Sequence, residues 1–189
     1  QSINSKSIRI GDSVFTEGVS VSKFVKAADR FYLENGTITK VKGNVDGNTI
    51  TWNGNKSNMT PASYAELMGG NINEYMLHIV SSKTVVNASD VSKLSNGNYT
   101  FTLELDKVKS VIRYVKNMKA TGGLSSYPVF SENIKLTVTI DSNFRLVEVT
   151  SEEKYSAKIG VLTAKSKGTL TIKFPYDGAC TIPQISQNT

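Results

Sequence analysis

The feature that most constrains the fold is a strict alternation of apolar and polar residues in the second half of the chain. From Tyr99 to Leu105, and again from Ile134 to Ile140, every second residue is apolar. A period of two places the apolar side chains on one face of a β-strand. The turn at 141–143 is too short for a parallel crossover. The pattern therefore predicts an antiparallel sheet with one face to cover.

Two segments have the apolar spacing of helices, and we expect these helices to cover the apolar face of the sheet. Residues 107–120 follow Asp106, which suits an N-cap, and precede a glycine pair that stops the helix. Residues 61–68 follow Thr60 in the same way. The apolar stripe of the longer helix consists of Val108, Val111, Ile112, Val115 and Met118. We therefore predict an α+β fold, a single antiparallel β-sheet with helices covering one of its faces.

The length of 189 residues predicts one domain, 1–189. Within it, residues 1–19 are expected to form an N-terminal arm or an edge strand, and 184–189 a polar tail. Residues 20–33 fit either a helix or a strand. Further expected elements are a hairpin at Asp46-Gly47, a strand over 74–86 and a helical turn over 89–94.

Uncharged polar side chains dominate the composition. Asn, Ser and Thr make up 56 of the 189 residues, which is typical of secreted and cell-surface β-proteins. The net charge of +6 comes from lysines spread along the chain without an arginine cluster, which argues against a nucleic-acid reader. No run approaches the roughly 18 apolar residues of a membrane span. We expect an extracellular or cell-envelope monomer.

Catalytic and metal-binding patterns are weak. His78 is the single histidine, placed mid-strand between apolar neighbours, and Cys180 is the single cysteine. Glu152 and Glu153 are adjacent, so a strand would send them to opposite faces. Glu104 and Glu148 are candidates for a cross-strand pair, although surface positions explain both. We therefore predict no enzyme, no catalytic residue, no metal and no cofactor.

The C-terminal half resembles a known family. The run 134–141 followed by 144–149 is similar to a hairpin of the LolA/LppX/LprG-like bacterial envelope lipoproteins, and 168–177 with Thr181–Pro183 is similar to their closing strand and ending. The resemblance covers residues 98–183. It implies a curved half-barrel plugged on its concave face by helices, export with removal of a signal peptide, and carriage of acyl chains. Because Gln1 is not a cysteine, a lipid anchor would precede it.

The resemblance and the pattern together predict a non-enzymatic exported or cell-surface protein. It would bind a lipid or other hydrophobic small molecule between sheet and helices, with association to a membrane surface. The expected ligand-lining residues are Phe101, Leu103, Leu136, Val138, Val111, Val115 and Met118. One alternative is that the same residues form a closed core. The other is a cell-surface interaction module that binds protein or glycan through its loops. Trp52, after the first hairpin, is expected to pack rather than to hold a ligand.

Overall fold

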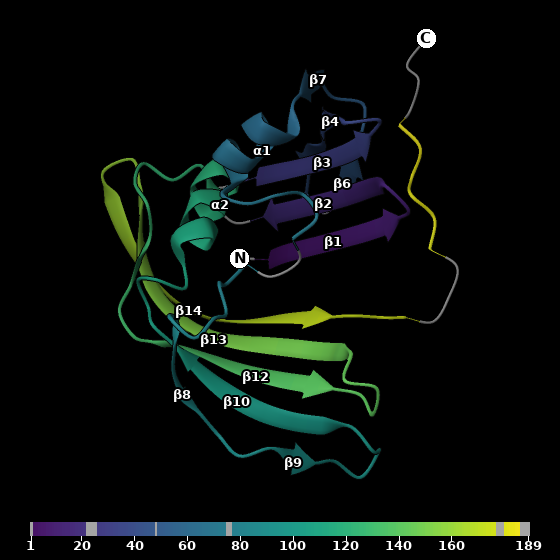
Figure 1. The fold of residues 1–189 in the computed structure, drawn as a ribbon. Helices are drawn as coiled ribbons and strands as arrows, with labels where there is room; N and C mark the ends of the chain where they lie inside the picture. Colours follow the sequence, from purple (N-terminus) through teal and green to yellow (C-terminus); the bar gives the residue numbers. More distant parts are fainter. Residues whose placement is uncertain (1, 22–25, 48, 75–76, 177–179, 186–189) are drawn as a thin grey trace. The chain divides into compact units, whose positions relative to one another are not determined.

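The protein is described by a computed structural model in which the chain divides into two compact units (Figure 1). The described residues are 2–21, 26–47, 49–74, 77–176 and 180–185. The first unit contains residues 1–77, 116–123 and 179–189. The second unit contains residues 78–115 and 124–178.

The first unit is built on a five-stranded antiparallel sheet with strand order β1-β2-β3-β4-β7. Its strands are β1 (Ser2–Ile10), β2 (Ser13–Val21), β3 (Lys26–Glu34), β4 (Thr37–Lys42) and β7 (Lys56–Met59). Most neighbours in this sheet are also neighbours in sequence, and short turns join β1 to β2 and β3 to β4. At Asn35-Gly36 both residues have positive φ, 49° and 74°, as a type I′ hairpin turn requires. The strands β5 (Asn44–Asp46) and β6 (Thr49–Thr51) form the expected hairpin at Asp46-Gly47.

The five-stranded sheet buries apolar side chains on both of its faces. On one face, Phe31 and Ile38 pack with Tyr64 of helix α1 (Pro61–Met68). On the other, Phe15 packs among Ile8, Tyr32 and Val41, with Ile182 and Ile185 from the end of the chain against them. The alternation of β2, β3 and β4 therefore supplies two separate apolar clusters.

Helix α1 forms where the sequence predicts it. The Thr60 side chain accepts a hydrogen bond from the Ser63 amide at 3.1 Å, Pro61 occupies the first turn, and Gly69 ends the helix with a φ of 84°. The Tyr64 ring meets Phe31 edge-on at 5.1 Å. This helix thus covers the five-stranded sheet of the first unit.

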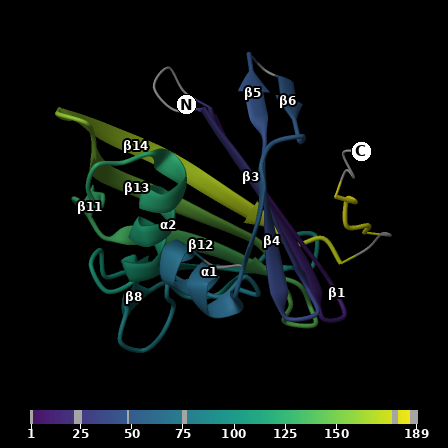
Figure 2. The same cartoon turned by 90° about the horizontal axis from the view of Figure 1, so that it is seen from above.

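The second unit is built on a seven-stranded antiparallel sheet (Figure 1, Figure 2). Across it run β14, β13, β12 and β10; β11 lies beside β13, and β8 and β9 lie beside β10. The bounds are β8 (Val85–Ala88), β9 (Ser92–Lys93), β10 (Tyr99–Leu105), β11 (Val129–Phe130), β12 (Ile134–Ile140), β13 (Leu146–Ile159) and β14 (Leu162–Lys173). The predicted alternating runs and the hairpin after Ile140 are confirmed.

One face of this sheet is buried and the other is polar. Leu105, Ile134 and Leu136 have no exposed surface, and Val138 and Val149 are buried beside them. The intervening residues point to the opposite, outer face. Helix α2 (Ile112–Gly122) crosses the division of the chain, so that only Ile112–Val115 belongs to the second unit.

The predicted fold class is wrong. Residues 2–59 do not supplement one curved sheet; they form a separate five-stranded sheet with its own core. The expected second covering helix, α1, packs on that sheet, and α2 is short. The described part of the chain is mostly β, in several sheets, none of them closed. The LolA-like fold that the resemblance implied, a half-barrel plugged by helices, is likewise wrong, and nothing in the structure supports the lipoprotein and signal-peptide predictions.

Several local predictions also fail, for reasons visible in the hydrogen bonds. Among the described residues of the predicted strand over 74–86, only Val85 and Val86 form strand, as the start of β8. The chain before them turns, because the Thr84 hydroxyl donates to the Ile79 carbonyl at 2.7 Å and accepts from the Ser81 amide at 2.9 Å. Such side chains compete with a strand ladder. Residues 75–76 of that segment lie outside the described residues.

Three other segments complete this comparison. The predicted helical turn over 89–94 contains strand β9 instead. Of the ambiguous segment 20–33, residues 26–33 form strand, and 22–25 lie outside the described residues. The longer helix starts at Ile112 rather than at 107, because the Asp106 carboxylate binds the amides of Val108 and Lys109 in a preceding turn.

Candidate functional site

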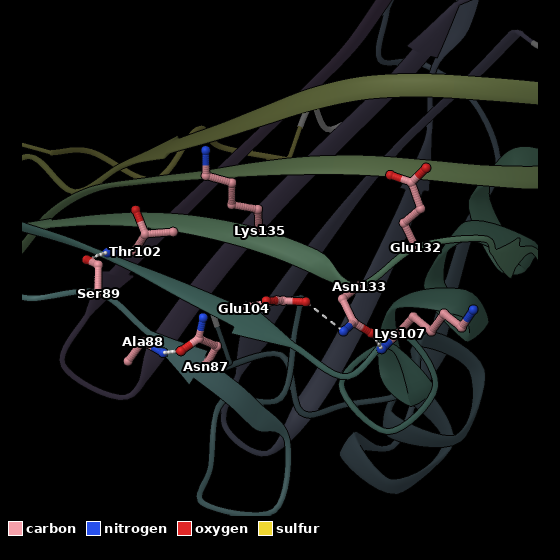
Figure 3. Close-up of a pocket in the computed structure, with 9 residues that line it drawn as sticks. All are labelled: Asn87, Ala88, Ser89, Thr102, Glu104, Lys107, Glu132, Asn133 and Lys135. Carbon is pink, nitrogen blue, oxygen red and sulfur yellow. Dashed lines mark hydrogen bonds between the residues drawn. The ribbon is translucent and has the colours of Figure 1, made fainter.

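The outer face of the seven-stranded sheet carries an open polar cleft of about 580 Å³ (Figure 3). Strand β10 supplies Thr102 and Glu104 on the face opposite its apolar residues, and Lys135 of β12 lies directly across from Glu104. The lining residues are Asn87, Ala88, Ser89, Thr102, Glu104, Lys107, Glu132, Asn133 and Lys135. All nine belong to the second unit. Eight of the nine side chains are polar.

Asn133 links two sides of this cleft. Its amide nitrogen Nδ2 donates to Glu104 Oε1 at 2.8 Å, and its Oδ1 accepts the Lys107 backbone amide at 3.2 Å. Figure 3 shows both contacts at one end of the cleft. The two bonds fix which way the amide points. Glu104 consequently keeps one carboxylate oxygen without a hydrogen bond to the described residues.

The opposite wall comes from β8 and the residue that follows it. Ser89 is held by a reciprocal pair: its amide donates to the Thr102 carbonyl at 2.8 Å, and its hydroxyl accepts the Thr102 amide at 2.9 Å. The Asn87 side-chain oxygen accepts the Ala88 amide at 2.9 Å. The Asn87 Nδ2 group therefore remains available as a donor. The wall is ordered by the sheet rather than by a long loop.

The charges around the cleft balance. Glu104 and Glu132 contribute two carboxylates, and Lys107 and Lys135 contribute two ammonium groups. The carboxylate of Glu132 is paired with Lys154 at 2.8 Å. The Lys107 Nζ donates to the Ser131 carbonyl at 2.9 Å. A balanced, hydrogen-bonding surface favours neutral polar ligands over strongly anionic ones.

A second group of polar residues is buried beneath the inner face. Glu153 of β13 is the centre: it accepts the Tyr114 hydroxyl at 3.0 Å through Oε2 and the Ser151 hydroxyl at 2.7 Å through Oε1. The His78 Nε2 lies 3.2 Å from Oε1, but the angle between the two groups does not allow a hydrogen bond. The His78 ring meets the Tyr114 ring edge-on at 5.0 Å. Burial, and then the Glu153 charge, raise the pKa of Tyr114.

This buried cluster does not have the geometry of a catalytic triad. In such a triad the histidine bonds the nucleophilic hydroxyl and the carboxylate stands behind the histidine. Here Ser151 bonds the carboxylate directly, and Ser151, His78 and Glu153 are each less than 5 % exposed. None of them lines the outer cleft. The cluster is therefore a packing element with satisfied hydroxyl groups.

The structure brings together four of the seven predicted ligand-lining residues as cross-strand pairs. Phe101 lies opposite Val138, and Leu103 lies opposite Leu136. Of these, Leu136 and Val138 are buried and the other two are half-buried. On the helical side, Val111 is buried and Val115 half-buried. Met118 belongs to the first unit and is not placed against this sheet.

Neither of two open clefts is lined by any of those seven residues. One is the polar cleft described above; the other, about 510 Å³, lies in the first unit among turn residues such as Asp12, Asn35 and Asn71. The candidate cross-strand pair of Glu104 and Glu148, which sequence analysis set below ordinary surface positions, does not form, because Glu104 faces Lys135 whereas Glu148 faces Thr139. The two residues are offset by four positions along the strand direction and lie on strands separated by β12, so that they are about 16 Å apart.

Sequence reasoning missed the polar cleft and the buried carboxylate. The cleft residues have the outward parity of an ordinary solvated strand face, which carries no signal of its own. For Glu153 there was a signal in the sequence. It lies an even number of residues from Val149 and Ser151, the buried positions of β13, and so points to the same face. The predicted opposite orientation of Glu152 and Glu153 is confirmed, since Glu152 is exposed and Glu153 buried.

Other candidate chemistry lies outside the cleft. Cys180 is exposed and free. Trp52 packs beneath Arg30, whose guanidinium carbon is 4.0 Å from the ring centroid. Within the described ranges, no three His, Cys, Asp or Glu side chains converge as metal ligands. The helices in these ranges are also too short or too polar to cross a membrane.

Comparisons with known proteins return no match to this chain. No family model, no curated protein and no solved structure is significantly similar to it. The resemblance to the LolA-like family therefore has no support from these comparisons. Arguments about function depend on the geometry of the cleft and of the exposed surface.

Proposed function

We propose that this protein is a non-enzymatic binding module whose outer cleft takes a neutral, hydroxyl-rich ligand of the glycan class. The observation that carries the proposal is the Glu104–Asn133 pair, at 2.8 Å, in a cleft of about 580 Å³. Clefts of roughly 300–1,000 Å³ suit small organic ligands. A short oligosaccharide falls within that class.

The donors and acceptors of the cleft complement sugar hydroxyl groups. A hydroxyl group donates once and accepts through two lone pairs. The free oxygen of Glu104 accepts, Asn87 Nδ2 donates, and the Lys135 ammonium donates. Because Asn133 and Ser89 are already fixed by hydrogen bonds, little side-chain freedom remains to be lost on binding.

Other ligand classes fit the cleft less well. The paired signs of Glu104, Glu132, Lys107 and Lys135 leave no net charge for a phosphate or a carboxylate. The lining offers one small apolar side chain, Ala88, which is too little for an acyl chain. A cell-surface setting agrees with the high content of Asn, Ser and Thr, and we include it in the proposal.

The test is direct binding of neutral oligosaccharides, screened on a glycan array and quantified by calorimetry. Asn133→Ala removes the group that orients Glu104, and Glu104→Gln replaces an acceptor oxygen. Each lost hydrogen bond to a ligand contributes about 1 kcal/mol, so we expect affinity to fall about fivefold to tenfold per variant. Glu148→Gln is the matched control, since it alters an outer-face carboxylate opposite Thr139.

The outcomes separate clearly. Binding that weakens in Asn133→Ala and Glu104→Gln, and not in Glu148→Gln, supports the proposal. If no neutral glycan binds, or if all three variants bind like wild type, the cleft is not a glycan site. Stronger binding of anionic glycans than of neutral ones would also contradict the charge argument.

A further inference from the structure

The hairpin of β13 and β14 ends in a tip with no polar residue on it. The two strands pair from Glu148 with Lys173 to Ile159 with Leu162, and Gly160-Val161 joins them. Gly160 has a φ of 60°, which a two-residue hairpin turn of type II′ requires at its first position. The second position accepts any small polar residue. Val161 is therefore not demanded by the turn.

The apolar side chains at this tip are exposed. Val161 is 97 % exposed and Leu162 63 % exposed. Beside them runs the segment that leads into β11, held by the Ser125 amide on the Lys158 carbonyl at 2.9 Å. That segment adds Val129, 66 % exposed, opposite Ser156 of β13. Val129 lies about 16 Å back from the tip along β13. Single exposed apolar residues are ordinary, but two adjacent ones at the turn of a hairpin, Val161 and Leu162, mark a candidate interaction surface.

The parts of the two strands nearest the tip carry positive charge without any negative charge. Residues 154–173 contain five lysines and no Asp or Glu. Lys154 is paired with Glu132, and Lys173 lies 3.8 Å from Glu148. Lys158, Lys165 and Lys167 form no ion pair with the residues that the structure describes. These three lysines lie behind the apolar tip, Lys158 on β13 and the other two on β14.

The opposite end of β13 provides an internal comparison. There Phe144 is 78 % exposed at the turn between β12 and β13, with a φ of 61°. Its neighbours Asp141 and Arg145 form an ion pair at 2.8 Å. This turn therefore has an exposed apolar side chain but no net charge. The fourteen residues of β13 separate the two ends by about 45 Å.

We infer that the β13–β14 tip docks on a membrane surface that contains anionic lipids. Val161 and Leu162 would enter the headgroup and acyl boundary, and Lys158 and Lys165 would contact lipid phosphates. A projecting two-residue tip offers too little area for a specific protein interface, which needs about 800 Å² from each partner. A lipid bilayer has no fixed shape to match. Apolar residues flanked by cations bind to it by inserting the apolar side chains and by attraction of the cations to anionic headgroups. This inference is independent of the glycan proposal.

The test is sedimentation of the protein with vesicles. One preparation is phosphatidylcholine alone; the other contains phosphatidylcholine and phosphatidylglycerol at about 2:1, which supplies a negative surface potential. We expect binding to the anionic vesicles only, weakened at high salt. Neutralising Lys158 and Lys165 together should lower the partition coefficient about thirtyfold, at roughly tenfold or less per lysine.

Two single substitutions separate the tip from general surface effects. Val161→Asp should abolish vesicle binding, and circular dichroism should show an unchanged fold because that side chain is exposed. Phe144→Asp, the matched control at the neutral turn, should bind like wild type. Wild type that ignores anionic vesicles, or Val161→Asp that binds them normally, overturns the inference. Equal loss in Phe144→Asp also overturns it, since the contact would not be specific to this tip.

Discussion

The two main sheets of this protein differ in how many faces they bury. The five-stranded sheet has an apolar cluster on each face, one around Phe31 and one around Phe15. The seven-stranded sheet buries Leu136 and its neighbours on one face and leaves the other polar. Only the second sheet therefore has a broad face available for a ligand, and the Glu104–Asn133 cleft lies on it.

The buried faces differ in chemistry as well. The clusters of the first unit consist of aliphatic and aromatic side chains. The inner face of the second unit includes Glu153, His78 and Ser151. Apolar side chains can pack against any apolar neighbour of suitable size, whereas a buried carboxylate requires hydrogen-bond donors at defined positions. The first unit should thus respond to lost volume, and the second to lost hydrogen bonds and to pH.

The largest effect is expected for Phe15→Ala in the first unit. Phe15 has no exposed surface, and its truncation leaves a cavity beside Tyr32, so that the free energy of unfolding should fall by about 3–5 kcal/mol. Urea unfolding followed by fluorescence measures it, because the single tryptophan, Trp52, lies in this unit. Ile10→Ala, at an exposed position of the same unit, should change it by less than about 0.5 kcal/mol. A Phe15→Ala effect below about 1 kcal/mol would break the comparison.

Glu153→Ala should have the largest effect on hydrogen bonding in the second unit. It leaves the Tyr114 and Ser151 hydroxyls buried without their acceptor, and we expect a loss of about 3 kcal/mol. Hydrogen exchange of the β12 and β13 amides measures it. Glu153→Gln retains an acceptor and should lose less. Equal losses in the two variants would show that side-chain volume, rather than hydrogen bonding, determines stability there.

Alkaline pH should destabilise the second unit through Tyr114. Burial raises its folded-state pKa above the ordinary 10.0, so the unfolded chain releases this proton first. Stability is thus fully present below pH 10 and falls above it, by at most about 1.4 kcal/mol per pH unit. Tyr114→Phe should flatten this dependence for the β13 amides in hydrogen exchange. Tyr64, whose pKa burial also raises, acts in the first unit and is unaffected by that substitution. An unchanged pH profile in Tyr114→Phe would contradict the assignment.

The smallest effect concerns the polar cap of helix α1 in the first unit. Thr60→Ala removes the acceptor of the Ser63 amide and should lower the free energy of unfolding by about 1 kcal/mol. Thr60→Ser keeps the oxygen and should recover most of that loss. The Trp52 fluorescence transition measures both. A loss as large as that of Phe15→Ala would mean that polar contacts matter as much in this unit as in the other.

Sequence reasoning predicted local elements where one strong pattern governed them. The alternation of β10 and β12, and the Thr60 cap of α1, depend on neighbours in the chain, and all formed as expected. The architecture depended on residues 2–59, where the periodicity over 20–33 did not separate helix from strand. The position of His78 depended on the turn that Ser81 and Thr84 close. There, side-chain hydrogen bonds replace the backbone hydrogen bonds of a strand, and the hydrophobic pattern of the sequence does not predict which of the two forms.

The cleft was not predictable for a different reason. Glu104 and Asn133 are distant in sequence, and their meeting requires both the register of β10 on β12 and the turn before Ile134. The outward residues of a strand are free to vary, so polarity alone does not distinguish a binding face from a solvated one.

The packing of Ile182 and Ile185 on the cluster around Phe15 has a consequence for synthesis on the ribosome. Strands β1 to β4 emerge first and find their partners at once. The cluster around Phe15, however, lacks these two isoleucines until residues 182–185 are made, after the whole second unit. During that interval the nascent protein presents Ile8, Phe15 and Val41 to solvent or to a chaperone. Premature termination before Ile182 would make that exposure permanent and would direct the fragment towards degradation.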